Sequence, residues 1–255
     1  MFKIDLTESF PPLSRAPIVE AVIGVTARAE SSWEEGAISE QLKQHLPEYP
    51  SIHAHREIQH ELKLATDAQP ELAVHDMGWR GLRCESADKL HIAQFNRDGF
   101  SFSRLNPYHG WEQFHQEGFR LWDIYKDVAQ PAEIQRIGLR FINRIEFLQN
   151  EVKLEDLLEN PPKPPRGMDV PFEGFLHQNT LVVAGHPSYR INLIQTVQPP
   201  QGVDASWGVI LDIDVFTTEP IVNPNLIGQH LTKMRWLKNK VFFGSITNKT
   251  LELIQ

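Results

Sequence analysis

Segment 135–147, QRIGLRFINRIEF, alternates apolar and polar side chains with a period of two residues. In a β-strand this period places successive side chains on opposite faces. The apolar face holds Ile137, Leu139, Phe141, Ile145 and Phe147, and the opposite face holds Arg136, Arg140, Arg144 and Glu146. We therefore expect a strand with one face in the core and a charged face on the other side.

The same alternation predicts further strands on both sides of this segment. Short turns such as Ala87-Asp88 and Asp98-Gly99 separate some of them, and turns of this length join only antiparallel neighbours. We therefore expect an antiparallel sheet, with strands near 17–29, 56–65, 79–86, 89–97, 99–105, 174–184, 189–198 and 208–217.

Apolar positions at helical spacing predict two long helices. The first begins near Trp111 and ends before Pro131, and the second spans about 225–245. Asn106, ahead of Pro107, is the expected capping residue of the first helix, because its side chain can accept a backbone hydrogen bond.

Short helices and an N-terminal arm complete the predicted elements. Ser31 or Ser32 is expected to cap a helix at 33–45, and a further short helix is expected at 154–159. Residues 1–16 are expected to form an extended arm, because the prolines in and just after this stretch prevent a regular helix.

The order of predicted elements repeats along the chain. Both 17–131 and 132–255 contain a strand, a helix, several antiparallel strands and a long helix, and the second also contains an exposed proline-rich connection at 161–171. The predicted fold is therefore α+β, with two tandem units and long helices on one face of the sheet. Two such units would form either a saddle or a helix-grip-like sheet.

Four segments resemble a sporadically distributed prokaryotic family of uncharacterised proteins. They are APIVEAVIGV at 16–25, FSRLNPYHGWEQF at 102–114, RIGLRFINRI at 136–145 and LKNKVFFGSIT at 237–247. The similarity covers most of the chain from Pro17 onward. The family has no known active site, so the resemblance implies only a full-length, stand-alone module. Its patchy distribution would suit an accessory gene, for example in defence or in a toxin–antitoxin pair.

Composition indicates a folded protein without a membrane-spanning helix. The chain has 255 residues, and its longest apolar runs contain acidic residues and are far shorter than the roughly 20 residues that a membrane helix needs. We do not expect the N-terminal segment to be a secretory signal, because it contains Asp5 and Glu8 and no long apolar run. The single cysteine, Cys84, excludes an intramolecular disulfide and suits a reducing cytoplasm, and we expect it to be a partly buried packing residue.

The missing motifs argue against the common enzyme classes. The chain has no phosphate-binding loop, dinucleotide fingerprint, zinc-protease motif, esterase elbow or cysteine pair, so we predict no cofactor and no catalytic residue. His53, His55 and His60 lack an acidic or thiol partner at a fixed spacing, so we expect loop histidines rather than a metal site.

The strongest candidate site is the arginine face, which comprises Arg136, Arg140 and Arg144. Guanidinium groups on alternate strand positions can hold an anionic ligand or an acidic partner. In the alternative interpretation the arginines are neutralised internally by Asp212 and Asp214 of the predicted strand 208–217.

Two further groups of residues are open to a functional interpretation. Arg104 and Tyr108 lie at a strand-to-helix junction that could face a cleft, although a simple turn also explains this segment. Aromatic residues at helical spacing could form a ligand cage, but they more often pack in a core. They are Trp111, Phe114, Trp122, Tyr125, Trp236, Phe242 and Phe243.

Three functional hypotheses follow. The leading one is a non-enzymatic cytoplasmic module that recognises a protein partner, or a second copy of itself, through the arginine face. The first alternative is a sensor or enzyme that takes a small, for example anionic, ligand in a cavity between sheet and helices. The second is nucleic-acid binding across a saddle, which the net charge of −8 disfavours.

Overall fold

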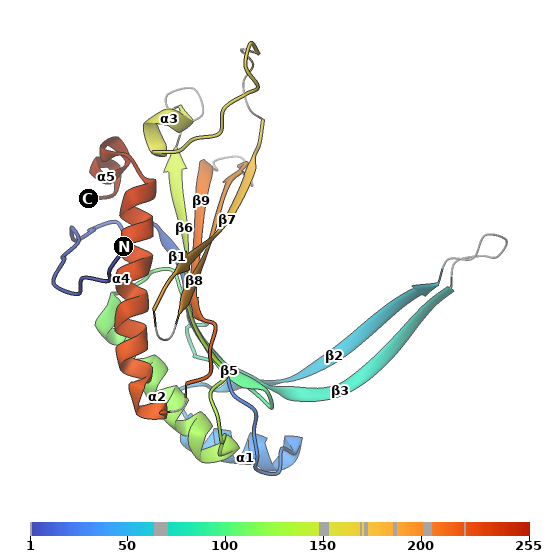
Figure 1. The fold of residues 1–255 in the computed structure, drawn as a ribbon. Helices are drawn as coiled ribbons and strands as arrows, with labels where there is room; N and C mark the ends of the chain where they lie inside the picture. Colours follow the sequence, from blue (N-terminus) through green and yellow to red (C-terminus); the bar gives the residue numbers. More distant parts are fainter. Residues whose placement is uncertain are drawn as a thin grey trace.

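The computed structural model describes most of the chain (Figure 1). The described residues are 2–63, 71–147, 153–168, 170, 173–185, 188–200, 206–221 and 223–255. For 59–63, 71–73 and 224 the structure describes the backbone but not the side chains. Within them the fold is α+β, with one antiparallel sheet of nine strands and five α-helices. None of the described helices is both long and apolar enough to cross a membrane.

The two strands at the centre of the sheet come from different halves of the chain. The order is β2-β3-β4-β5-β1-β6-β9-β8-β7, so β1 pairs with β6 and each of them pairs on its other side with the last strand of its own half. The strands are β1 Ile18–Thr26, β2 Ser51–Lys63, β3 Glu71–Glu85, β4 His91–Asn96, β5 Gly99–Leu105, β6 Arg136–Phe147, β7 Leu176–Val183, β8 Tyr189–Gln198 and β9 Trp207–Thr217.

The two long helices pack against the same side of the sheet (Figure 1). Helix α2 contacts β5, and helix α4 contacts β6 and β9. The helices are α1 Glu35–His45, α2 Trp111–Ala129, α3 Leu154–Leu157, α4 Ile227–Ser245 and α5 Asn248–Ile254, with a 3-10 turn at Pro224–Leu226 directly before α4.

Strand β6 has the two faces that its sequence predicts. Its apolar side chains are buried, with Ile137 and Leu139 fully inaccessible. Asn143 breaks the apolar alternation and is also buried, with an exposed fraction of 2%. This position tolerates an amide because Nδ2 of Asn143 donates a hydrogen bond to the carbonyl of Leu211 at 2.9 Å.

The predicted helix caps are wrong. Helix α1 begins at Glu35, and the Oγ of Ser31 instead donates a hydrogen bond to the carbonyl of Val128 at 2.7 Å. Helix α2 begins after Gly110, which has a φ of 115°, and no side chain caps it. Asn106 is therefore not the capping residue, because the turn through Pro107 places it too far from the first helical turn.

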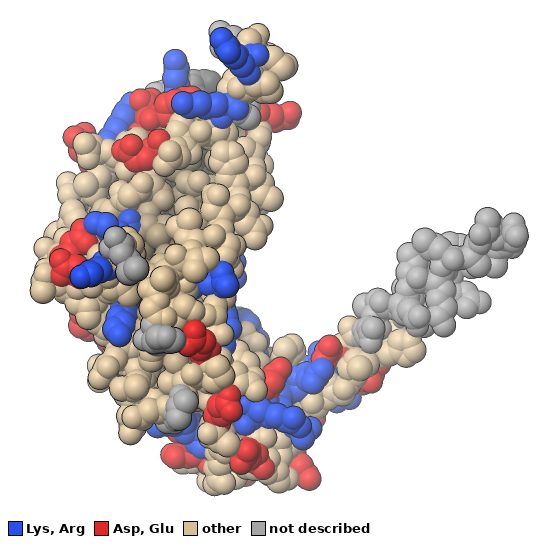
Figure 2. Space-filling view, in the orientation of Figure 1, with Lys and Arg blue, Asp and Glu red and all other residues tan. Residues whose placement is uncertain are grey.

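The hairpin β2–β3 projects well beyond the rest of the sheet (Figure 1). Both strands are longer than predicted, and only Gly81–Glu85 of β3 pairs with β4. Ile58 and Val74 are therefore 55% and 57% exposed, although the alternation around Ile58 predicts a core strand. Figure 2 shows mixed charge along this hairpin, where Arg56 and Asp76 form an ion pair at 2.8 Å.

Several short segments differ from their predictions. Helix α3 is a single turn, and Pro162 is buried although the proline-rich connection was expected to be wholly exposed. Helix α5 was not predicted. Thr247 caps its start, since the Oγ1 of Thr247 accepts a hydrogen bond from the amide of Thr250 at 3.2 Å. The amide of Arg15 in the N-terminal arm donates a hydrogen bond to the carbonyl of Ile254 in its last turn.

Helix α2 lies unusually close to the sheet at Gly118. A Cβ placed on Gly118 would lie 2.7 Å from Cδ1 of Ile23 and 3.3 Å from Cδ1 of Phe102. We expect Gly118→Leu to lower the free energy of unfolding by about 1–3 kcal/mol, because overpacking forces neighbouring side chains out of their rotamers. Urea unfolding followed by tryptophan fluorescence measures this change.

The matched control is Gly244→Leu in α4, where a Cβ would meet nothing within 4 Å. This substitution gains the same helix propensity without the clash and should be neutral or stabilising by up to ~1 kcal/mol. Equal effects of the two substitutions would contradict the close approach of α2 to the sheet.

Candidate functional site

The arginine face of β6 is engaged in ion pairs with β9. The backbone register places Arg140 opposite Asp214, but the guanidinium of Arg140 reaches diagonally to Asp212, with Nε 2.7 Å from Oδ1. Asp214 is left to Arg136 at 3.1 Å. Burial raises the pKa of Asp214 even though both arginines oppose that shift.

Arg144 is held by three groups on neighbouring segments. It forms an ion pair with Glu146, and it donates hydrogen bonds to Oε1 of Gln198 at 3.0 Å and to the carbonyl of Ser206 at 2.7 Å. A Cβ on Gly208 would lie 2.7 Å from Nε of Arg144, so glycine leaves room for this side chain. Arg136 and Arg140 thus pair with the two aspartates, as the internal-neutralisation interpretation expects, and Arg144 has other partners within the chain.

The two candidate residues at the strand-to-helix junction, Arg104 and Tyr108, have different surroundings. Arg104 is only 5% exposed and donates hydrogen bonds to the carbonyl of Pro107 at 3.1 and 2.8 Å, so it holds the loop in shape. Tyr108 instead lines a cavity and packs edge-on against Phe141, with ring centroids 5.7 Å apart. Burial raises the pKa of the Tyr108 hydroxyl, which therefore stays protonated.

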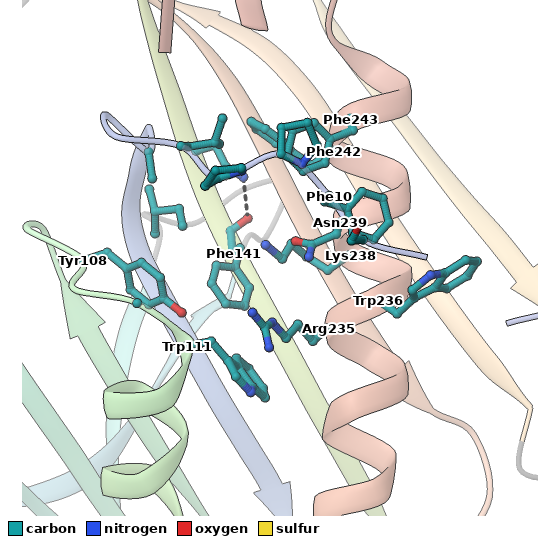
Figure 3. Close-up of a pocket in the computed structure, with 18 of the residues that line it drawn as sticks. Phe10, Tyr108, Trp111, Phe141, Arg235, Trp236, Lys238, Asn239, Phe242 and Phe243 are labelled. Atoms are coloured by element: carbon teal, nitrogen blue, oxygen red, sulfur yellow. Dashed lines mark hydrogen bonds between the residues drawn. The ribbon is translucent and has the colours of Figure 1, made fainter. Parts of the chain in front are cut away.

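The cavity has a volume of about 660 Å³ and lies between the sheet and helix α4 (Figure 3). Its walls come from β6, α4, the loop that leads into α2 and the N-terminal arm. The side chains that define its chemistry are Phe10, Tyr108, Trp111, Phe141, Asn143, Arg235, Trp236, Lys238, Asn239, Phe242 and Phe243.

Lys238 places an ammonium group in this cavity, with no counterion among the described residues. The residue is 9% exposed, and its Nζ lies 4.1 Å from the ring centroid of Phe141. Among the described residues no carboxylate pairs with it and no hydrogen-bond partner is present. Burial, together with the nearby charge of Arg235, lowers the pKa of Lys238 to about 7.

Arg235 adds a second cation one helical turn before Lys238. Both side chains extend from α4 toward Phe141 in Figure 3. The Cζ of Arg235 lies 5.1 Å from the ring centroid of Trp111, and its nearest carboxylate is that of Glu112, at 3.8 Å. Glu112 is 83% exposed, so solvent screens this pair and Arg235 keeps much of its capacity to bind an anion.

The N-terminal arm forms the outer wall of the cavity. Phe10 stacks on Phe243 with centroids 5.3 Å apart and also contacts Trp236. Nζ of Lys240 lies 2.6 Å from a carboxylate oxygen of Glu8. Residues 2–16 form neither helix nor strand and contain turns at 6–7 and 14–15, and Phe10 anchors the segment to α4.

Sequence reasoning missed Lys238 although a signal was present. Lys238 follows Met234 by four residues, so it lies on the same apolar stripe as Leu231, where a charged side chain is unexpected. The aromatic residues were assigned to core packing, and this assignment holds for Phe114, Trp122 and Tyr125. Aromatic residues of α4 and Trp111 additionally line the cavity.

The remaining chemical candidates have other surroundings. His53 and His55 lie on exposed positions of β2 rather than in a loop, and the side chain of His60 is outside the described set. No cluster of three potential metal ligands occurs among the described side chains. Cys84 is fully buried, and burial raises the pKa of its thiol to about 12.

No model of a known protein family and no curated protein sequence matches this chain. The side chains of the cavity are therefore the best basis for a functional assignment.

The Arg140–Asp212 pair supports a stability prediction. The side chain of Asp212 is 10% exposed, so removing its partner leaves a mostly buried carboxylate without its main compensation. We expect Arg140→Ala to lower the free energy of unfolding by about 1–3 kcal/mol, measured by urea denaturation.

Arg56→Ala is the matched control, since the Arg56–Asp76 pair is about half exposed on both sides. Exposed pairs contribute ~0–1 kcal/mol, so this change should be small. If both variants lost the same stability, the arginine face would not be part of the structural framework of the sheet.

Lys238 makes stability depend on pH in a defined direction. Its pKa is near 10.5 in the unfolded chain and about 7 in the folded protein, so the unfolded state binds more protons between these values and stability rises with pH there. Lys238→Met should be more stable than the wild type at pH 7, and this difference should shrink as the pH approaches 10. Thermal unfolding across this range measures the difference, and a constant difference would contradict the burial of the ammonium.

Proposed function

We propose that this protein binds a small organic anion in the cavity between β6 and α4. The observation that carries the proposal is the buried ammonium of Lys238, which lacks a counterion among the described residues. A buried charge without a partner is costly, and an anionic ligand would supply the missing partner. This proposal takes up the cavity hypothesis that the sequence leaves open.

The cavity also indicates what kind of molecule it accepts. Its volume of about 660 Å³ falls within the ~300–1,000 Å³ that is typical of small-molecule sites. Aromatic side chains form its walls, whereas cationic groups come from one side, on α4. This combination suits a carboxylate attached to a planar or apolar body.

Protein binding through the arginine face remains a second proposal, with weaker support. The ion pairs with Asp212 and Asp214 already explain why arginines occur on this face. Nucleic-acid binding has less support still, because acidic groups are interspersed among the arginines and Figure 2 shows both signs of charge on the visible surface.

We further propose that the chain is a tandem duplication of units 17–131 and 132–255 that together form a saddle. The support is the matching position of β1 and β6, each beside the last strand of its half. An accessory role for such a module, as the resemblance to a sporadic prokaryotic family implies, fits a ligand-responsive protein.

Calorimetry with phenylacetate and phenyllactate tests the proposed function. We expect both to bind, and we expect Lys238→Met to weaken binding about 10- to 100-fold, which corresponds to losing one charge-assisted hydrogen bond of ~1.5–3 kcal/mol. The control is Lys249→Met, since Lys249 lies on α5 and pairs with Asp156 at 3.2 Å, away from the cavity. The absence of binding by the wild type would overturn the proposal.

Binding should also tighten as the pH falls through about 7, because the anion favours protonated Lys238. The other charged groups that face the cavity are Arg235 from α4, Glu112 from α2, His109 from the loop and Glu8 from the arm. His109→Asn separates the contribution of His109. Affinity that is the same at pH 6 and pH 9 would contradict the role of Lys238.

A further inference from the structure

We propose that Lys238 is a nucleophile that forms a reversible imine with the carbonyl group of a 2-oxo acid, while Arg235 holds the adjacent carboxylate. This inference rests on the proposed function and narrows its ligand class. It assigns a covalent role to a side chain that a simple anion receptor would use only as a charge.

The placement of the two cations fits a ligand with two adjacent functional groups. Arg235 and Lys238 are three residues apart on α4, a rise of ~4.5 Å along the helix, and both extend into the cavity. A 2-oxo acid carries its carbonyl and carboxylate on neighbouring carbons. The planar guanidinium fork suits the carboxylate, whereas the primary amine is the group that can add to the carbonyl.

The surroundings of Lys238 favour the neutral, nucleophilic amine. Lysine nucleophiles are activated by burial and by a neighbouring cation, and Lys238 has both, because it is only 9% exposed and Arg235 lies one helical turn before it. With a pKa of about 7, Lys238 has roughly a thousandfold more free amine at neutral pH than an ordinary lysine. No carboxylate among the described residues pairs with Lys238, so no such partner favours its protonated form.

The proposed step balances without an oxidant or reductant. The amine nitrogen adds to the carbonyl carbon to give a carbinolamine, and loss of water then gives the imine. The departing water takes the carbonyl oxygen and two hydrogens that come from the amine. Hydrolysis reverses both steps and releases the 2-oxo acid unchanged.

A purely structural lysine would behave differently. If Lys238 served only to pack against Phe141, its chemical labelling would follow its low exposure. It would then react less than exposed lysines such as Lys240, whose side chain is 46% accessible. The two interpretations therefore predict opposite orders of reactivity.

The experiment is reductive trapping of the full-length protein with phenylpyruvate and cyanoborohydride at pH 7. Hydride addition to the imine gives a stable secondary amine, and the protein gains the mass of the 2-oxo acid less one oxygen atom. We expect peptide mapping to locate the adduct on Lys238 in at least tenfold excess over Lys240 and Lys249. Phenyllactate, which has a hydroxyl in place of the carbonyl, should compete and reduce the labelling.

The substituted protein separates binding from the covalent step. Lys238→Arg keeps the positive charge but lacks the primary amine, so it should still bind phenylpyruvate in calorimetry and should lose the adduct. Lys249→Arg should label as the wild type does, because Lys249 pairs with Asp156 away from the cavity. The wild-type peptide map decides the question even if Lys238→Arg fails to fold.

The outcomes distinguish this inference from the proposed function. Phenylpyruvate that binds the wild type without a trapped adduct, or with labelling spread over exposed lysines, would overturn the imine and leave anion binding intact. If the wild type bound neither phenylpyruvate nor phenyllactate, the proposed function and the inference would both fail.

Discussion

The pairing of β1 with β6 is the interaction on which the rest of the structure depends. It joins strands from the two halves of the chain into one sheet, with Val22 opposite Arg140 at its centre. The side chains of β6 alternate between the two faces of this sheet, so Phe141 faces α4 and Arg140 lies on the opposite face. The core and the candidate site therefore share one framework, since Phe141 belongs to both.

The charged side chains on the two faces of β6 have different kinds of partners. On one face Arg136 and Arg140 have carboxylate partners on β9, and those pairs remain partly open to solvent. On the other face Arg235 and Lys238 of α4 line the cavity, and Lys238 contacts an aromatic ring and has no carboxylate partner among the described residues. An arrangement that leaves a charge uncompensated costs stability, and such costs are commonest where a protein binds a ligand.

Much of the fold was predictable because β6, β8, β9 and the long helices carry strong periodic patterns, and their predicted ranges agree closely with the structure. The predictions differ from the structure where the periodic segment is short or where the local structure depends on residues distant in the sequence. Helix α5 has seven residues, which are too few to show a clear helical period. Ser31 does not cap α1 because its hydroxyl donates a hydrogen bond to the carbonyl of Val128, which is distant in the sequence. Ile58 is exposed because β3 extends well beyond the part that pairs with β4, and no local sequence pattern predicts this difference in strand length.

The sequence by itself determined the α+β class, the antiparallel strands and the arginine and aspartate positions on the charged faces of two strands, because these follow from the local period of side chains along each strand. The pairing of those arginines and aspartates was decided by the tertiary structure. Only the tertiary structure decided that Lys238 lies beside Phe141 with no carboxylate partner among the described residues, and that an arm more than 200 residues earlier in the chain lines the same cavity. In the sequence alone, Lys238 is a charged residue that interrupts the apolar stripe of a helix. Its place beside Phe141 is known only once that helix is packed on the sheet. Burial and the lack of a counterion are properties of the surroundings, and those come from segments far apart in the chain.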